Sequence, residues 1–191
     1  MNFTRWILLA ACAVVVSGCS WPGAADDWKG AVARQTGHLG YRNWIVICEA
    51  SFPAQNRPGI RHVNAQAEIP EVVDYVLQTL EQTEHVRPRI YLTRELRSVE
   101  NDYAPGIDVL RKRLDQALHG HEPTELDQEA LLTLMQDAGR DFQVLVIRTP
   151  TALPYSSVFM ELQPGYWDAE SESRLRERIE QERTNRLARP L

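Results

Sequence analysis

The stretch LGYRNWIVICEASFPA, residues 39–54, decides the fold of this chain. Its centre, Trp44 to Cys48, is an apolar run of strand length rich in β-branched residues, which is typical of a strand buried in a parallel sheet. Glu49 follows the run directly, and Phe52-Pro53 opens a loop. Because ligands gather at the carboxyl ends of strands in open α/β sheets, Glu49 is a candidate site residue. The alternative is an acid that only caps a turn or the next helix.

Helical and strand patterns alternate on the carboxyl side of this run. The patterns predict helices over 70–82, 108–118 and 126–138, and strands over 89–93 and 142–147. Such alternation predicts one α/β layered domain. Thr124, with Gln128 or Glu129, is expected to cap the third of these helices after a loop.

The opening stretch resembles the N-terminal signature of the D-ribose pyranase and L-fucose mutarotase family, which reads roughly L-G-H-x-D-x-L/I-V-V-C-D-A-x-F/L-P. The matching residues, without a gap, are Leu39, Gly40, Cys48, Ala50, Phe52 and Pro53. A second segment, VLVIRTPTALPYSS at 144–157, is similar to the family's last core strand and the motifs after it. The resemblance covers roughly residues 35–167, and it implies a three-layer α/β/α domain.

The resemblance also implies proton-transfer chemistry on a sugar. Mutarotation opens a cyclic hemiacetal and recloses it, which needs a base at the anomeric hydroxyl and an acid at the ring oxygen. Tyr41 and Glu49 are the catalytic candidates, because they stand where the family has its catalytic His and its Asp. A Tyr hydroxyl has a pKa near 10, so it is a poor base at neutral pH unless a neighbouring cation lowers that value. The expectation is the family fold with altered chemistry.

Four further residues are implied as sugar-binding. Arg148 and Tyr155 match the family's pattern, and Ser157 replaces its sugar-binding Asn. The family's basic residue before the last strand has no counterpart in 131–135, and His62 is the candidate replacement.

The positions at which the sequence differs from the family's pattern allow several different functions. One is a monosaccharide-binding protein, or a mutarotase or pyranase that interconverts anomers or ring forms of an aldose. Another is a catalytically inactive envelope lipoprotein that acts as a ligand-binding or protein-interaction module. A structural lipoprotein acting through its C-terminal helix and a pocket for an unrelated metabolite also remain open. The family assembles into rings with sites between subunits, so the resemblance implies a homo-oligomer, and no cofactor is expected.

The first residues of the chain predict a targeting signal. Residues 1–18 combine Arg5, a short apolar run and Val-Ser-Gly before Cys19, which resembles a lipoprotein signal peptide with Cys19 as the acylated residue. An ordinary signal peptide is the alternative. The residue after Cys19 is Ser20, which resembles the pattern of outer-membrane lipoproteins, so we expect a bacterial envelope protein, lipid-anchored and facing the periplasm. Small and polar residues at 19–29 predict a tether, followed by the folded domain at 30–167.

Charge and metal patterns exclude some partners. The chain has 26 acidic and 21 basic residues, interspersed, so the basic patch of a nucleic-acid binder is not expected. Residues 168–191 predict a charged helical extension, which is either a peripheral helix or a surface for an oligomer or partner contact. His119, His121 and Glu122 form a loop cluster without a third strong ligand, so no metal site is predicted.

Overall fold

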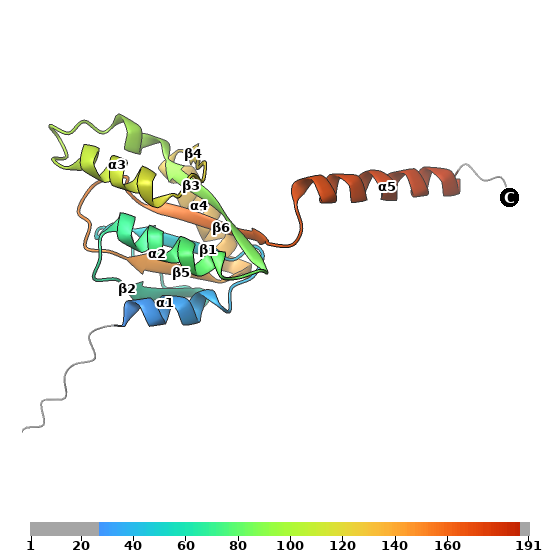
Figure 1. Cartoon of the computed structure of the whole chain (residues 1–191), viewed down its shortest axis with the longest axis horizontal. Helices are drawn as coiled ribbons and strands as arrows, with labels where there is room; N and C mark the ends of the chain where they lie inside the picture. The colour runs from blue at the N-terminus through green and yellow to red at the C-terminus, as the bar shows by residue number, and fades with distance from the viewer. Residues whose placement is uncertain (1–26, 188–191) are drawn as a thin grey trace, which may run out of the picture.

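The computed structural model of the chain describes residues 27–187. The elements are α1 (Trp28–Thr36), β1 (Trp44–Cys48), β2 (Ile60–Asn64), α2 (Ile69–Glu81), β3 (Val86–Thr93), the 3₁₀ helix η1 (Arg94–Ser98), α3 (Ile107–Ala117), β4 (Thr124–Leu126), α4 (Gln128–Asp141), β5 (Val144–Arg148), β6 (Val158–Pro164) and α5 (Ala169–Leu187) (Figure 1). The predicted signal peptide, Cys19 and most of the tether lie outside the described residues. The first helix begins at Trp28, where the Asp27 side chain accepts a hydrogen bond from the Gly30 amide at 2.8 Å. The domain boundary predicted at residue 30 falls within this helix.

One six-stranded sheet, in the order β2-β5-β1-β6-β3-β4, forms the middle of the domain. Parallel pairs join β2 to β5, β5 to β1, and β3 to β4. The antiparallel strand β6 lies between β1 and β3. Five strands therefore run in one direction, and their carboxyl ends meet at one edge of the sheet.

The central strand is β1, and it has the predicted bounds. All five of its residues are buried, which agrees with its uninterrupted apolar run. Its register places Cys48 opposite Arg148 of β5 and Ile47 opposite Val158 of β6. The strand is thus parallel to one neighbour and antiparallel to the other, whereas the sequence pattern indicated only a parallel sheet.

Helices cover both faces of the sheet, as expected for a three-layer α/β/α domain. On one face, α1, α2 and α3 pack on alternate strand residues such as Ile45 and Ile147. On the other face, Leu131 and Met135 of α4 pack with the intervening residues of the same strands, such as Val46. Alternate burial of this kind follows from the two-residue period of a strand.

The predicted helices and strands are found with their ends shifted by up to three residues. Five elements were not predicted, namely α1, β2, η1, β4 and β6. The expected loop before α4 contains the short strand β4, which pairs with β3. The prediction that Thr124 caps α4 is wrong, because Thr124 is the first residue of that strand. The cap position is Asp127, and the Glu95 carboxylate accepts the Gln128 amide at 3.0 and 3.2 Å. A partner from η1 therefore takes the role that was assigned to local residues.

The C-terminal helix α5 leaves the end of β6 and extends away from the sheet (Figure 1). None of its residues is buried, as its dense charges predicted. Ion pairs one turn apart, such as Arg176 with Glu172 at 2.7 Å, run along its surface. Among residues 27–187, no helix is both long and apolar enough to span a bilayer.

Candidate functional site

The carboxyl edge of the sheet brings most of the predicted site residues to one side of the molecule. Arg148 is the last residue of β5, and Glu49 follows β1. Ser157 precedes β6, whose reversed direction puts its amino end at the same edge. This arrangement follows from the strand directions, and it is the usual position for ligands in open α/β sheets.

Glu49 and Ser157 form a buried pair at this edge. The side chains of both residues are buried, and Ser157 Oγ donates a hydrogen bond to Glu49 Oε2. A carboxylate out of water needs such a donor, because an unpaired buried acid is costly. The pair joins the two segments that carry the family resemblance.

Further hydrogen bonds hold those two segments together. Arg148 Nη1 donates to the Ala50 carbonyl at 2.7 Å, and the Thr149 hydroxyl donates to the Cys48 carbonyl at 2.9 Å. The Ala50 amide donates to the Thr151 carbonyl at 2.9 Å. Arg148 therefore fixes the loop after β1 with at least part of its guanidinium. Burial raises the pKa of the neighbouring Cys48 thiol to about 12, which disfavours the reactive thiolate form.

Tyr155, which precedes Ser157 in the same loop before β6, lines a cavity of about 310 Å³. The other walls include Arg94 and Glu95, which follow β3, and Asp127, which follows β4. The Thr93 hydroxyl donates to the Tyr155 carbonyl at 2.7 Å, and Tyr155 has a left-handed backbone with φ 58°. A bulky residue rarely adopts that conformation, and the hydrogen bond from Thr93 helps to hold the Tyr155 backbone in it.

The cavity beside Tyr155 offers both hydrogen-bond donors and acceptors. Arg94 Nη1 and Asp127 Oδ1 form an exposed ion pair at 3.0 Å. Glu95 is occupied by the Gln128 amide, so its carboxylate is fixed at the start of α4. Together with an aromatic ring and its hydroxyl, these groups suit a small ligand that carries several hydroxyl groups.

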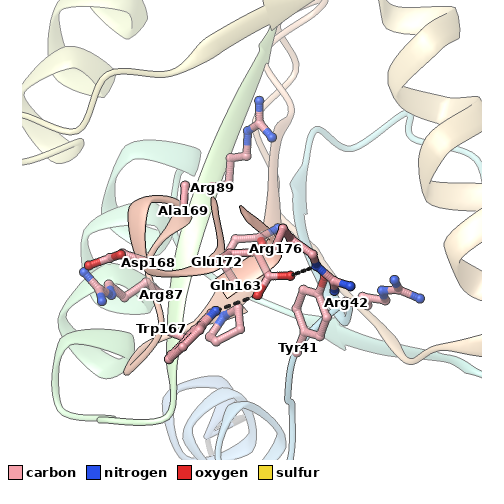
Figure 2. Close-up of a pocket in the computed structure, with 11 residues that line it drawn as sticks. Tyr41, Arg42, Arg87, Arg89, Gln163, Trp167, Asp168, Ala169, Glu172 and Arg176 are labelled. Atoms are coloured by element: carbon pink, nitrogen blue, oxygen red, sulfur yellow. Dashed lines mark hydrogen bonds and ion pairs between the residues drawn. The ribbon is translucent and has the colours of Figure 1, made fainter. Parts of the chain in front are cut away.

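Tyr41 lies at the opposite edge of the sheet from Glu49. It precedes β1, and its neighbour Arg42 donates its amide to the Leu162 carbonyl near the end of β6. At about 3.3 Å per residue, roughly 15 Å of strand separates the two ends of β1. Figure 2 shows Tyr41 in a second cavity with Arg42 and Gln163. The two catalytic candidates are therefore not brought together within one chain.

His62 is also distant from the Tyr155 cavity. It lies in the middle of the edge strand β2, and three strands separate β2 from β3. Its Nε2 is 2.8 Å from the Gln55 carbonyl oxygen, so the ring bonds to the loop after β1. The loop histidine His119 pairs with Asp74 of α2 at 2.6 Å. No cluster of three metal-ligating side chains occurs within residues 27–187.

Sequence reasoning missed Arg94, Glu95 and Asp127 as residues of this cavity. The strand-end rule that singled out Glu49 applies equally to Arg94, the first residue after β3. Asp127 had no such signal, because the strand before it was not predicted.

Comparison with known proteins gives matches among solved structures alone. No protein-family model matches the chain, and no curated protein matches it. The chain is similar to Bacillus subtilis RbsD complexed with D-ribose, at 18% identity over 69% of this chain and 89% of that chain, with a TM-score of 0.49. It is similar to the fucose mutarotase of Streptococcus pneumoniae in complex with L-fucose, at 17% identity over 67% and 87%, with a TM-score of 0.45. It is also similar to FucU from Bifidobacterium longum, at 13% identity over 69% and 92%, with a TM-score of 0.47. These proteins are of the kind that segments 39–54 and 144–157 resemble.

Proposed function

We propose that this chain binds a monosaccharide at the carboxyl edge of its sheet. The observation that carries the proposal is the cavity beside Tyr155, which lies at the same edge of the sheet as the buried pair of Glu49 and Ser157. Its volume of about 310 Å³ suits one small ligand, because it is at the lower end of the usual range for ligand pockets. The Tyr155 ring offers an apolar face, and Arg94 and Asp127 offer partners for hydroxyl groups.

A single chain can bind a monosaccharide in this arrangement, but it does not bring together the groups that would interconvert its anomers. A mutarotase needs two proton carriers at one sugar, and Tyr41 and Glu49 lie at opposite ends of β1. We therefore favour a catalytically inactive ligand-binding module as the function of an isolated subunit.

A mutarotase or pyranase formed by several copies is the second candidate. Tyr41 is 53% exposed, so its side chain is accessible to a second copy of the chain. Its hydroxyl could then lie at the carboxyl edge of the sheet of that second copy. In that arrangement Tyr41 of one copy and Glu49 of another would share one sugar, and Arg148 would keep its loop in place. The homo-oligomer implied by the sequence resemblance is a requirement of this candidate.

The expected location is part of the proposal. We propose that Cys19 carries a lipid that anchors the domain to the envelope, with the sheet in the periplasm. A Cys19→Ala variant should lose the acyl mass in mass spectrometry and appear in the soluble periplasmic fraction. Retention of the variant in the membrane fraction would contradict the anchor.

Saturation-transfer and exchange NMR on the full chain tests binding and turnover together. Ribose, fucose and other common aldoses are the probes, and we expect saturation transfer that Tyr155→Ala abolishes. Tyr103→Ala is the matched control, because Tyr103 is 85% exposed and does not line the cavity. Absence of transfer from every sugar, or equal loss in the control, would contradict the binding site.

A complementation experiment separates the two candidates. Tyr41→Phe and Glu49→Gln chains are mixed after each has been measured alone. If a site takes one residue from each of two copies, mixed oligomers restore anomer exchange that both variants lack. Binding with no exchange in the unmodified chain would leave only the binding module.

A further inference from the structure

A second cavity, of about 700 Å³, lies at the amino edge of the sheet, where β6 passes into α5 (Figure 2). Its lining combines residues from four parts of the chain, among them Tyr41, Arg42, Arg87, Arg89 and Trp167. It is separated from the Tyr155 cavity by the length of the central strands. The monosaccharide proposal makes no use of its arginines.

Positive charge is concentrated in this cavity, although the chain as a whole has a net charge of −5. Four arginines and two acids line it. Both acids have structural partners: Glu172 accepts the Trp167 indole N–H at 2.8 Å and Arg176 Nε at 2.7 Å, and Asp168 accepts the Ser171 amide at 2.7 Å. Glu172 thereby neutralises Arg176 and fixes the Trp167 ring.

The other three arginines form no ion pair within 4 Å among the described residues. They are held by other means. The Arg42 guanidinium lies 5.2 Å from the Tyr41 ring centroid, and that of Arg89 lies 5.4 Å from the Tyr91 ring. Arg87 Nη2 donates to the Gly165 carbonyl. These contacts orient the guanidinium groups without neutralising their charge, which favours binding of an anion.

The arginines surround the cavity instead of meeting at one point. Figure 2 shows the side chains of Arg42, Arg87 and Arg89 extending in three different directions. One phosphate or carboxylate group cannot contact all three. A ligand that uses them must carry separated anionic groups.

Aromatic surface lies between these charges. Tyr41 and Trp167 are 53% and 41% exposed, and both line the cavity. Aromatic faces pack against the apolar faces of sugar rings, and Arg forms two-point hydrogen bonds with carboxylates. An oligonucleotide fits less well, because the two acids of the lining and the negative chain oppose its dense phosphate charge.

We propose that this cavity binds an acidic oligosaccharide, with its carboxylates at Arg42, Arg87 and Arg89 and a sugar ring against Trp167. This cavity shares no lining residue with the Tyr155 cavity, and α5 supplies part of its wall through Arg176 and Glu172.

Isothermal titration of the full chain with a tetrasaccharide of galacturonic acid tests this proposal. We expect binding that weakens as salt rises, and about tenfold weaker binding for Arg87→Gln and for Arg89→Gln. Both side chains are exposed, so neither change should disturb the fold, and circular dichroism checks this. Arg174→Gln is the matched control, because Arg174 pairs with Glu170 on α5 outside the cavity and should bind normally.

Other probes define the results that overturn the proposal. A neutral galactose tetrasaccharide should not bind, and an equal affinity for it would show that the arginines are not used. A short oligothymidylate and vesicles containing phosphatidylglycerol are each compared with the acidic tetrasaccharide. Tighter binding of either one would overturn the proposal and assign the cavity to a nucleic acid or to a membrane surface. Failure of the acidic tetrasaccharide to bind at millimolar concentration would also refute the proposal. Each of these results leaves the Tyr155 titration with aldoses unaffected, so the two proposals fail separately.

Discussion

Ser157 Oγ donates a hydrogen bond to Glu49 Oε2 and joins two residues that are 108 positions apart in the chain. Both side chains are buried, and the bond links the loop after β1 to the start of β6. This hydrogen bond is one of the contacts that join the N-terminal and C-terminal parts of the domain.

Loss of the Ser157 hydroxyl is expected to destabilise the fold. Ser157→Ala should lower the free energy of unfolding by about 1–3 kcal/mol, because it removes a donor from a buried acid. Urea unfolding at pH 7 measures the change. The matched control is Ser156→Ala, since Ser156 is also buried but donates to the neutral Leu153 carbonyl, at 2.7 Å. A cost for Ser156→Ala that equals or exceeds the cost for Ser157→Ala would contradict the role of Glu49.

Stability should fall in alkaline solution because of Cys48. Burial is the main cause that raises the pKa of this thiol from 9.0 to about 12. Above pH 9 the unfolded chain loses the proton while the folded chain keeps it, so unfolding is favoured by at most about 1.4 kcal/mol for each pH unit. Urea unfolding between pH 8 and pH 10 should show a steeper decline than in Cys48→Ala, with Cys12 and Cys19 replaced by Ser in both chains. Equal slopes would refute the prediction.

Gly165 occupies a position where a side chain has no room. A Cβ atom there would lie 2.2 Å from the Glu84 carbonyl oxygen, so Gly165→Ala must displace the backbone where β6 leads into α5. We expect a loss of about 1–3 kcal/mol in the free energy of unfolding, as for other overpacked sites. Gly40→Ala is the matched control, because a Cβ at Gly40 meets nothing within 4 Å. Thermal unfolding of the two variants should separate them clearly.

Arg94 should affect ligand binding more than stability. Its ion pair with Asp127 is exposed, so Arg94→Ala should change the free energy of unfolding by less than about 1 kcal/mol. The same change should weaken aldose binding by about tenfold if Arg94 bonds a sugar hydroxyl. Titration followed by saturation transfer gives the affinity, with Arg97→Ala as the control, because Arg97 pairs with Glu125 and does not line the Tyr155 cavity. A normal affinity in Arg94→Ala would remove this residue from the site.

The sequence predicted the elements that have a clear hydrophobic period. The strand β1 has the predicted bounds, because five consecutive apolar residues between polar ones define where the strand begins and ends. The helix α2 is shifted by one residue at each end relative to its predicted bounds. The strand β4 was missed because three residues carry no period, and its pairing with β3 depends on contacts distant in sequence. The antiparallel direction of β6 depends on the same kind of contact.

The candidate site was predicted in part for a related reason. The residues next to strand ends, Glu49 and Ser157, come together because strand direction alone places them at one edge. Tyr41 was assigned by analogy to a His, yet it is at the amino edge, which its position before β1 already implied. In the proposed mutarotase of several copies, Tyr41 would reach Glu49 of another copy, and no pattern within one chain encodes that contact.

The strand order has a consequence for biosynthesis. Within the described residues, β1, β2 and β3 each pair with β5 or β6, which are formed from residues 144–164. A nascent chain that has not yet reached residue 144 cannot give the central strand a partner, so its apolar segments remain exposed to chaperones and proteases. A ribosome-arrested chain that ends at Asp141 is therefore expected to be digested, whereas release of the whole chain should confer protection. For export as proposed above, late closure of the sheet would keep the polypeptide in the extended state that a translocation channel accepts.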